Sequence, residues 1–193
     1  DMLGEGSRTE SDSINYFEAY SDAIKRIGRF SAPEKSVEEN DGISVKLSAL
    51  HNRYEFRHES TVMKKLYQRI KKLCLEAKTF NISLSLDAEE SARLDLAMQI
   101  FENLSREPEL NGWDGLGFVL QSYLKRAPLV LKWLDALASE TNQKFMIRLV
   151  KGAYWDTEIK RAQEKGLKEY PVYTRKVNTD ACYHYCTHLL SLN

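Results

Sequence analysis

Short apolar runs alternate with longer amphipathic stretches along most of this chain of 193 residues. The short runs have the length of strands, and the longer stretches repeat apolar residues at helical spacing. Strands that alternate with helices predict β-α units and a parallel sheet, because two parallel strands need a crossover connection between them. This alternation constrains the fold more than any other feature of the sequence.

Four strands are clear, at 42–47, 82–86, 116–120 and 145–150, and a fifth is predicted at 1–4. Helices are predicted from a cap at Thr9 or Ser11 onward and at 62–80, 94–104, 128–140, 158–165 and 179–192. No GxGxxG fingerprint follows any strand, which favours a barrel over a dinucleotide-binding doubly wound sheet. A (β/α)8 TIM-like barrel takes ~250 residues. We therefore expect an α/β fragment over 1–193, truncated at both ends, that holds roughly the first five β-α units.

The composition excludes several classes of protein. Lys+Arg and Asp+Glu both number 28, so net charge gives no reason to expect nucleic-acid binding. No apolar run approaches the ~20 residues of a membrane span, and no signal-peptide pattern opens the chain. Three cysteines without close pairing argue against a disulfide framework and fit a reducing compartment. Cys182 and Cys186 lie near two histidines but on one short helix, so packing is favoured over a zinc site and no metal is expected.

Each predicted strand ends in polar residues. In strand order these are Asp1 with Glu5, Lys46, Asp87 with Glu89, Gln121, and Arg148 with Lys151. Because parallel strands in a barrel end at one rim, we expect these side chains to converge there. Both charge signs are present, which favours an active site over ordinary strand ends that turn polar in solvent.

The residues at this rim differ in how strongly they indicate a functional role. Lys46 interrupts an apolar run, and burial under helices is costly, so we expect it at the barrel mouth. Arg148 lies within an apolar stretch and needs an acceptor, for which Asp87 or a bound anion would serve. Asp87 is equally consistent with a helix cap. Glu89 and Glu90 are predicted to be solvated or to begin a helix.

The residues after Arg148 suggest a cofactor. Gly152 allows close approach to the backbone, and Tyr154 and Trp155 either pack in the protein or wall a planar cofactor. The basic, aromatic stretch 170–176 either donates to phosphate or is a solvated loop. No Ser-His-Asp arrangement, HExxH motif or P-loop spacing is present. The rim indicates an anionic ligand or cofactor with proton or hydride transfer.

Six segments, which span nearly the whole chain in order, resemble the proline dehydrogenase domain of bifunctional proline utilization A enzymes. They are residues 1–5, 43–51, 87–90, 117–123, 148–156 and 170–176. The resemblance implies a distorted (β/α) barrel that binds FAD and oxidises L-proline to pyrroline-5-carboxylate. A hydride passes to flavin N5, and a membrane quinone receives the electrons.

The resemblance also assigns roles by matching motif. Asp87 and Arg148 are implied as catalytic, with Arg148 donating near flavin N5. Lys46 helps to hold the substrate carboxylate, Tyr154 lines the proline pocket, and Asp1 and Glu5 lie at its entrance, with Glu5 as a gate partner. The implied FAD-binding residues are Ala88, Gln121, Arg148, Val150, Lys151, Gly152, Ala153 and Trp155.

The resemblance extends to parts outside this chain. The family's Arg-Arg-x-x-Glu motif, which clamps the substrate carboxylate, does not occur here. The aldehyde dehydrogenase domain of the parent enzyme and the DNA-binding segment of some members also lie outside. The implied location is the cytoplasm, with peripheral binding to the inner membrane when the protein is reduced.

Two alternatives remain open at this point. One is a barrel lyase or aldolase that uses Lys46 as a Schiff-base nucleophile. The other is that the isolated fragment is inactive and self-associates through an open sheet edge at its last strand.

Overall fold

The sheet consists of four parallel strands in the order β1-β2-β3-β4. The computed structural model describes residues 6–32 and 34–192. Within them, the strands are β1 (Ile43–Val45), β2 (Leu84–Leu86), β3 (Leu116–Gln121) and β4 (Met146–Val150). One row of the register runs from Val45 through Leu86 and Phe118 to Ile147. The four clear strands and the α/β class are therefore confirmed, while the strand predicted at 1–4 lies outside the described residues.

The helices are those that the periodicity predicts, with ends that differ by up to three residues. They are α1 (Glu10–Gly28), α2 (Glu59–Thr79), α3 (Leu94–Ser105), α4 (Ala127–Thr141), α5 (Trp155–Glu164) and α6 (Lys176–Leu190). Single 3-10 turns occur at Leu47–Ala49, Phe56–His58, Ser91–Arg93 and Pro108–Leu110. Thr9 caps α1 in a capping box with Asp12, which satisfies two amides that the helix leaves unpaired.

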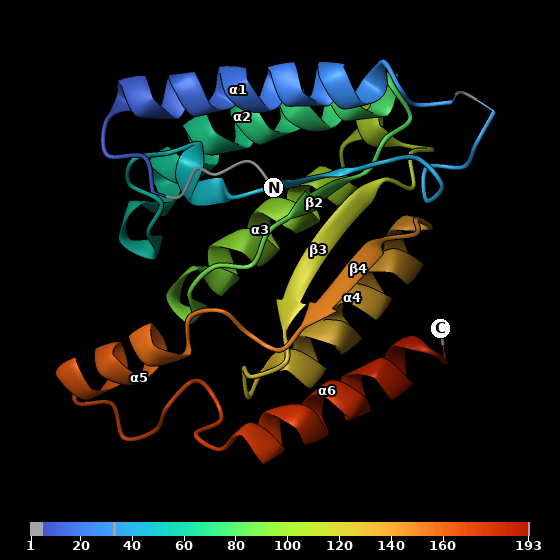
Figure 1. Ribbon diagram of the computed structural model, residues 1–193. Coiled ribbons are helices and arrows are strands. Elements are labelled where there is room, and N and C mark those ends of the chain that lie inside the picture. The colour runs from blue at the N-terminus through green and yellow to red at the C-terminus, as the bar shows by residue number, and fades with distance from the viewer. Residues whose placement is uncertain (1–5, 33, 193) are drawn as a thin grey trace.

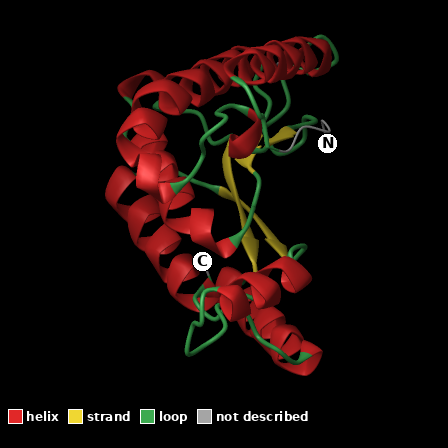
Figure 2. Cartoon of the chain, turned by 90° about the vertical axis from the view of Figure 1, so that its left-hand side faces the viewer, coloured by secondary structure: helices red, strands yellow, loops and turns green. Residues whose placement is uncertain are grey.

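The helices form an arc around the strands (Figure 2), as expected for part of a barrel wall. Helices α1 and α2 lie side by side, and α4 and α6 pack beyond β4 at the other end of the sheet (Figure 1). Such an arc leaves one face of the sheet toward the helices and the other toward the barrel interior.

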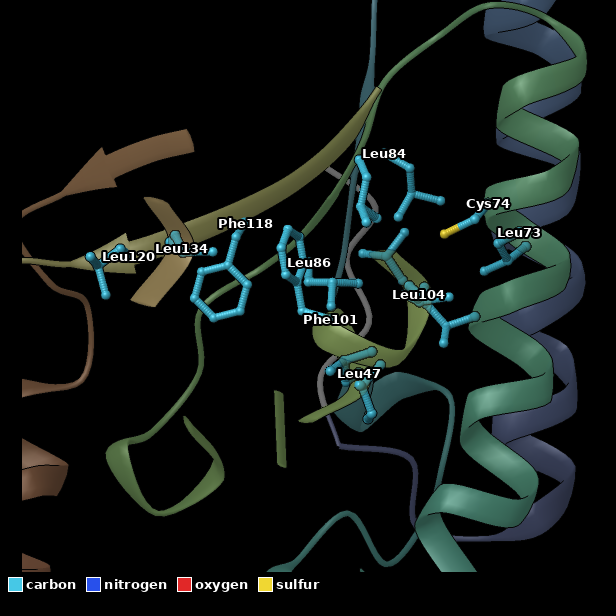
Figure 3. Close-up of a cluster of buried hydrophobic side chains, with 14 of the residues drawn as sticks. Leu47, Leu73, Cys74, Leu84, Leu86, Phe101, Leu104, Phe118, Leu120 and Leu134 are labelled. Atoms are coloured by element: carbon cyan, nitrogen blue, oxygen red, sulfur yellow. The ribbon is translucent and has the colours of Figure 1, made fainter. Parts of the chain in front are cut away.

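The hydrophobic core fills the space between the sheet and its helices. Figure 3 shows side chains from β2 and β3 packed with residues of α2, α3 and α4. Phe101 of α3 is central, since its ring meets Phe118 edge to face with ring centroids 5.2 Å apart. Burial of each such aromatic or leucine side chain contributes about 1.5–3 kcal/mol. Alternate strand residues therefore pack against the helices, and the residues between them point to the opposite face of the sheet.

The opposite face of the sheet carries small residues in its first row. Ser44, Ser85 and Gly117 lie in register across β1, β2 and β3. A Cβ atom on Gly117 would lie 2.3 Å from Ser85 Oγ, so the row has no room for a larger side chain. Arg148 of β4 lies on the same face and donates to Ser44 Oγ at 3.0 Å. The small side chains of this row therefore leave space above this face of the sheet for the long side chain of Arg148.

Two features of the described residues concern membranes and metals. No helix in residues 6–32 and 34–192 is long and apolar enough to cross a membrane. The same residues contain no group of three or more His, Cys, Asp or Glu side chains arranged to hold a metal ion. Cys182 and Cys186 are buried on α6, with their sulfur atoms 3.9 Å apart.

Candidate active site

Asp87 lies at the centre of the polar residues at the carboxyl ends of the strands. It directly follows β2, and its backbone N–H donates to the Val45 carbonyl at 2.9 Å, which extends the β1–β2 pairing. Its Oδ2 atom accepts from Lys46 Nζ at 2.5 Å, and its Oδ1 atom accepts from Arg148 Nη2 at 2.9 Å. One carboxylate therefore joins two cations that come from β4 and from the end of β1.

Burial makes this cluster electrostatically strong. The side chain of Asp87 is 13% exposed and that of Lys46 is 20% exposed. Charge-assisted hydrogen bonds in such a setting are shorter and about twice as strong as neutral ones. The sequence predicted that Arg148 needs an acceptor and that Asp87 would serve, and this pairing is present. The alternative for Asp87, a cap of the following helix, is wrong, because α3 begins seven residues later.

Arg148 is more exposed than its apolar neighbours indicate. The other residues of β4 are half-buried, and the Arg148 side chain is 48% exposed. The apolar run at 145–150 predicts a buried strand, and this prediction is wrong for the described residues, because β4 pairs there with β3 alone. The guanidinium is held at Asp87 and Ser44 and also faces solvent, as a group that binds a ligand must.

Lys46 is fixed by its backbone as well as its ammonium. It follows β1 and precedes a 3-10 turn, and its N–H donates to the Tyr20 hydroxyl of α1 at 3.2 Å. Burial raises the pKa of Tyr20, so this hydroxyl stays protonated at neutral pH. The predicted position of Lys46 at the barrel mouth, outside the helical core, is confirmed.

Gln121 bridges two of the loops that follow strands. It ends β3 and is fully buried. Its Nε2 atom donates to the Glu89 carbonyl at 2.9 Å, and its Oε1 atom accepts from the Ala153 N–H at 2.9 Å. The side-chain amide thus sets the distance between the loop after β2, which includes Ala88, and the loop after β4.

The loop after β4 approaches a tyrosine ring at Gly152. This residue has φ +146°, a conformation that favours glycine, and a Cβ atom there would lie 2.3 Å from Cδ2 of Tyr123. Lys151, Gly152 and Ala153 are exposed, while Val150 and Tyr154 are half-buried. The loop therefore presents backbone and a cation to solvent beside Arg148.

Two side chains of this loop are held by later parts of the chain. Lys151 Nζ bonds to Asp180 of α6 at 2.6 Å, and Trp155 Nε1 donates to the Tyr173 carbonyl at 2.9 Å. The ammonium groups of Lys151 and Lys176 lower the pKa of Asp180 to about 2. The 170–176 stretch, for which phosphate binding or a solvated loop was predicted, packs against the segment after β3, where Val172 bridges Leu124.

The structure brings together Lys46, Asp87, Ala88, Gln121 and the loop from Arg148 to Trp155. Tyr154 lies at the N-terminal end of α5, where its carbonyl accepts from the Glu158 N–H at 2.9 Å. Asp1 and Glu5 lie outside the described residues.

Glu89 is a site residue that sequence reasoning placed wrongly. A solvated position or a helix start was predicted, but its side chain is only 4% exposed. Its Oε1 atom accepts from the Ser48 N–H at 2.9 Å, and Oε2 pairs with Arg93. Burial raises the pKa of Glu89, while Arg93 and Ser48 favour the charged form. Its spacing two residues after Asp87 was the available signal.

Glu158 was missed altogether. It is 3% exposed on α5 and accepts from the N–H of Ser91 at 2.5 Å and from its Oγ at 2.6 Å. Glu90 pairs with Arg161 of the same helix at 3.1 Å. Both contacts fix α5 to the loop after β2. The available signal was the helical spacing that places Glu158 on the same face as the buried Ala162.

We expect Glu158→Ala to destabilise this contact, because it leaves the N–H and hydroxyl of the half-buried Ser91 without their acceptor. Leaving such groups unsatisfied costs about 1–3 kcal/mol each. The midpoint of thermal unfolding of the full-length protein should fall clearly. Glu164→Ala on the same helix is the matched control, since its partner Lys160 is 3.9 Å away and both are exposed. Equal midpoints for the two variants would show that Glu158 does not fix α5.

Comparison with protein families gives a match over nearly the whole chain. The model of the family described as proline dehydrogenase matches residues 1–192. The chain is 52% identical over 186 residues to the bifunctional protein PutA of Salmonella typhimurium. That alignment covers 96% of this chain and 14% of the relative, so the chain spans a small part of the relative's length.

Solved structures agree with this match. A crystal structure of proline utilization A from Bradyrhizobium japonicum superposes with a TM-score of 0.97 at 48% identity, over 100% of this chain and 20% of that one. Proline utilization A from Bdellovibrio bacteriovorus, inactivated by N-propargylglycine, gives a TM-score of 0.88 at 28% identity, over 97% of this chain and 20% of that one.

Proposed function

Since this chain belongs to the proline dehydrogenase family, we propose that it is the part of a flavoenzyme in which L-proline is oxidised to pyrroline-5-carboxylate. The observation that carries the proposal is the carboxylate of Asp87 held between the cations Lys46 and Arg148. These charges lie at the carboxyl ends of parallel strands, where barrel enzymes hold their substrates.

The residues after β4 have the chemistry to hold FAD. Arg148 and Lys151 supply positive charge, and the exposed backbone at Gly152 is positioned by the Ala153–Gln121 hydrogen bond. Gly152 packs against the Tyr123 ring with no space for a Cβ atom, which fixes the course of this loop. The residues proposed to bind FAD are Ala88, Gln121, Arg148, Val150, Lys151, Gly152, Ala153 and Trp155.

The reaction removes two electrons and two protons from proline. A C–H bond beside the ring nitrogen breaks, its hydrogen leaves as hydride, and the nitrogen lone pair forms the C=N bond after the N–H proton is lost. Bound FAD supplies the acceptor for the hydride at N5. The protein's part is to orient the substrate and to stabilise charge as it develops.

Lys46 and Arg148 divide this work. Lys46 carries three N–H donors, one of which goes to Asp87, and its charge suits the proline carboxylate. Arg148 places positive charge where reduction makes the isoalloxazine ring more negative. Asp87 orients both cations and offsets their mutual repulsion. Tyr154 lines the proline pocket in this proposal, and Asp1 and Glu5 lie at its entrance.

The alternative of a Schiff-base lyase is disfavoured by the Lys46–Asp87 pair. A lysine nucleophile must be a neutral amine, whereas a carboxylate at 2.5 Å favours the ammonium. Borohydride trapping of a carbonyl substrate on Lys46 would support the lyase.

The proposal extends to the parent protein. The relatives named PutA are described as bifunctional, and we propose an aldehyde dehydrogenase domain in the same parent chain. We also propose that a membrane quinone receives the electrons and that the protein is cytoplasmic and binds peripherally to the inner membrane when reduced. DNA binding, where present, belongs to a segment outside these residues. The isolated 193 residues are proposed to be inactive, because the substrate clamp is not among them.

The experiment is to purify the full-length protein, record its visible absorbance and assay proline-dependent reduction of a dye. We expect a flavin spectrum and dye reduction that requires L-proline. A colourless protein with no proline-dependent reduction would refute the proposed function.

A further inference from the structure

The carboxylate of Glu89 has a contact that its neighbour Glu90 does not have. Both carboxylates pair with Arg93, Glu89 at 2.5 Å and Glu90 at 3.1 Å. The other oxygen of Glu89 accepts from the backbone N–H of Ser48 at 2.9 Å, whereas the other partner of Glu90 is Arg161. Of these two glutamates, Glu89 therefore bonds to the segment after β1, whereas Glu90 bonds to α5.

Ser48 in turn holds the beginning of the described chain. Its carbonyl accepts from the N–H of Ser7 at 3.0 Å and from the Ser7 hydroxyl at 3.1 Å. Its own hydroxyl accepts from the Gly6 N–H at 3.1 Å. Ser7 and Ser48 are both buried, so these groups have no water to replace a lost bond. Gly6 and Ser7 directly follow Asp1–Glu5 in the sequence.

The backbone of Glu89 is held on its other side. Its carbonyl accepts from Gln121 Nε2, and Gln121 Oε1 accepts from Ala153 N–H. Glu89 is thus bonded to the segment that follows β1, to the end of β3 and, through Gln121, to the loop after β4. Because these polar groups form one continuous hydrogen-bonded network, we expect the displacement of one group to displace the others.

We propose that Glu89 is a positioning residue that acts through Ser48 on Gly6 and Ser7, and so fixes these residues relative to the Asp87 centre (Lys46, Asp87 and Arg148). The expected effect on substrate binding rests on the proposed function, whereas the coupling of Glu89 to Gly6 and Ser7 does not. Glu89 touches none of the reacting groups that we assign. Its side chain is nearly fully buried, where a carboxylate is costly unless each oxygen has a partner.

The test compares Glu89→Ala with Glu90→Ala in the full-length protein. Both variants remove a carboxylate from Arg93, and only the first removes the acceptor of Ser48. Residue-resolved hydrogen exchange should show Gly6, Ser7 and Ser48 amides exchanging about tenfold faster in Glu89→Ala, as expected for loss of about one buried hydrogen bond. Glu90→Ala should leave these three amides unchanged. Equal exchange in the two variants would overturn the proposal.

Steady-state kinetics give the functional readout. Glu89→Ala should raise KM for L-proline by about fivefold and leave kcat within about twofold, since Glu89 holds the turn directly after Lys46, which we assign to the substrate carboxylate, and so alters binding more than chemistry. Glu89→Gln retains an oxygen for Ser48 and should restore KM to within about twofold of the wild type. A fall in kcat with unchanged KM, or no rescue by Glu89→Gln, would contradict the proposal.

Ser48→Ala covers the case in which Glu89→Ala does not fold. It introduces no unpaired charge and removes only the hydroxyl that accepts from Gly6. Faster exchange at Gly6 with a raised KM supports the coupling, and unchanged values overturn it. If the wild-type protein does not oxidise proline, the proposed function fails, while the exchange measurements still decide the coupling.

Discussion

Replacement of Asp87 by Asn should lower kcat/KM for L-proline by about 10²–10³, the usual cost of removing one preorganised electrostatic group. The carboxylate accepts from Lys46 on one oxygen and from Arg148 on the other. An amide has one acceptor oxygen, so its NH₂ group must face one of the two cations. The variant keeps the size of the side chain but leaves Lys46 and Arg148 without a shared counter-charge.

The matched control for this variant is Asp95→Asn. Asp95 also accepts from an arginine, Arg126, at 2.7 Å, but both side chains are more than half exposed. Exposed ion pairs contribute about 0–1 kcal/mol. The control should therefore stay within about twofold of wild-type kcat/KM. A value for Asp87→Asn that matches the control would show that Asp87 does not organise the site.

Gly152→Ala should remove most of the bound flavin from the purified full-length protein. The methyl group would lie 2.3 Å from the ring of Tyr123, which is buried and has no room to retreat. Overpacking of this kind costs about 1–3 kcal/mol. The φ angle of +146° adds about 1–3 kcal/mol of backbone strain. Together they should displace the loop from 150 to 155 and lower flavin retention by about tenfold or more.

Gly166→Ala separates strain from steric clash. Gly166 also has a positive φ, +59°, but no heavy atom lies within 4 Å of an added Cβ. It should cost about 1 kcal/mol of stability and leave the flavin content unchanged. The ratio of flavin to protein absorbance measures the difference. Full flavin content in Gly152→Ala would exclude this loop from the cofactor site.

Much of the fold follows from local pattern. The capping box at Thr9 and the apolar periodicity identify α1, and alternation of strand and helix predicts the parallel sheet. The convergence of Lys46, Asp87 and Arg148 also follows, because parallel strands bring their carboxyl ends to one edge. These features depend on short stretches of sequence and on one topological rule.

The buried acids could not be predicted in the same way. Glu158 and Ser91 lie 67 residues apart, and Glu89 and Ser48 lie 41 apart. A glutamate after a strand or in the first turn of a helix is usually solvated, so the local pattern favours the wrong environment. Only the tertiary packing of α5 and of the loop after β1 supplies the donors that make burial tolerable.

The exposure of Arg148 shows a second limit of local pattern. Its apolar neighbours predict a strand covered on both sides, but exposure depends on what lies beside the strand. In the described residues β4 is at one end of the sheet, and Arg148 is half exposed while still bound to Asp87. The pairing was predictable from charge, and the degree of burial was not.

The central claim is that the Asp87 centre orients proline and a flavin for hydride transfer. The most direct test is anaerobic mixing of the full-length protein with L-proline while the flavin absorbance near 450 nm is followed, a band that belongs to the cofactor. We predict complete bleaching in the wild type and bleaching slower by about 10² or more in Asp87→Asn, with flavin still bound. Bleaching at the same rate in both proteins, or none in a flavin-loaded wild type, would contradict the claim.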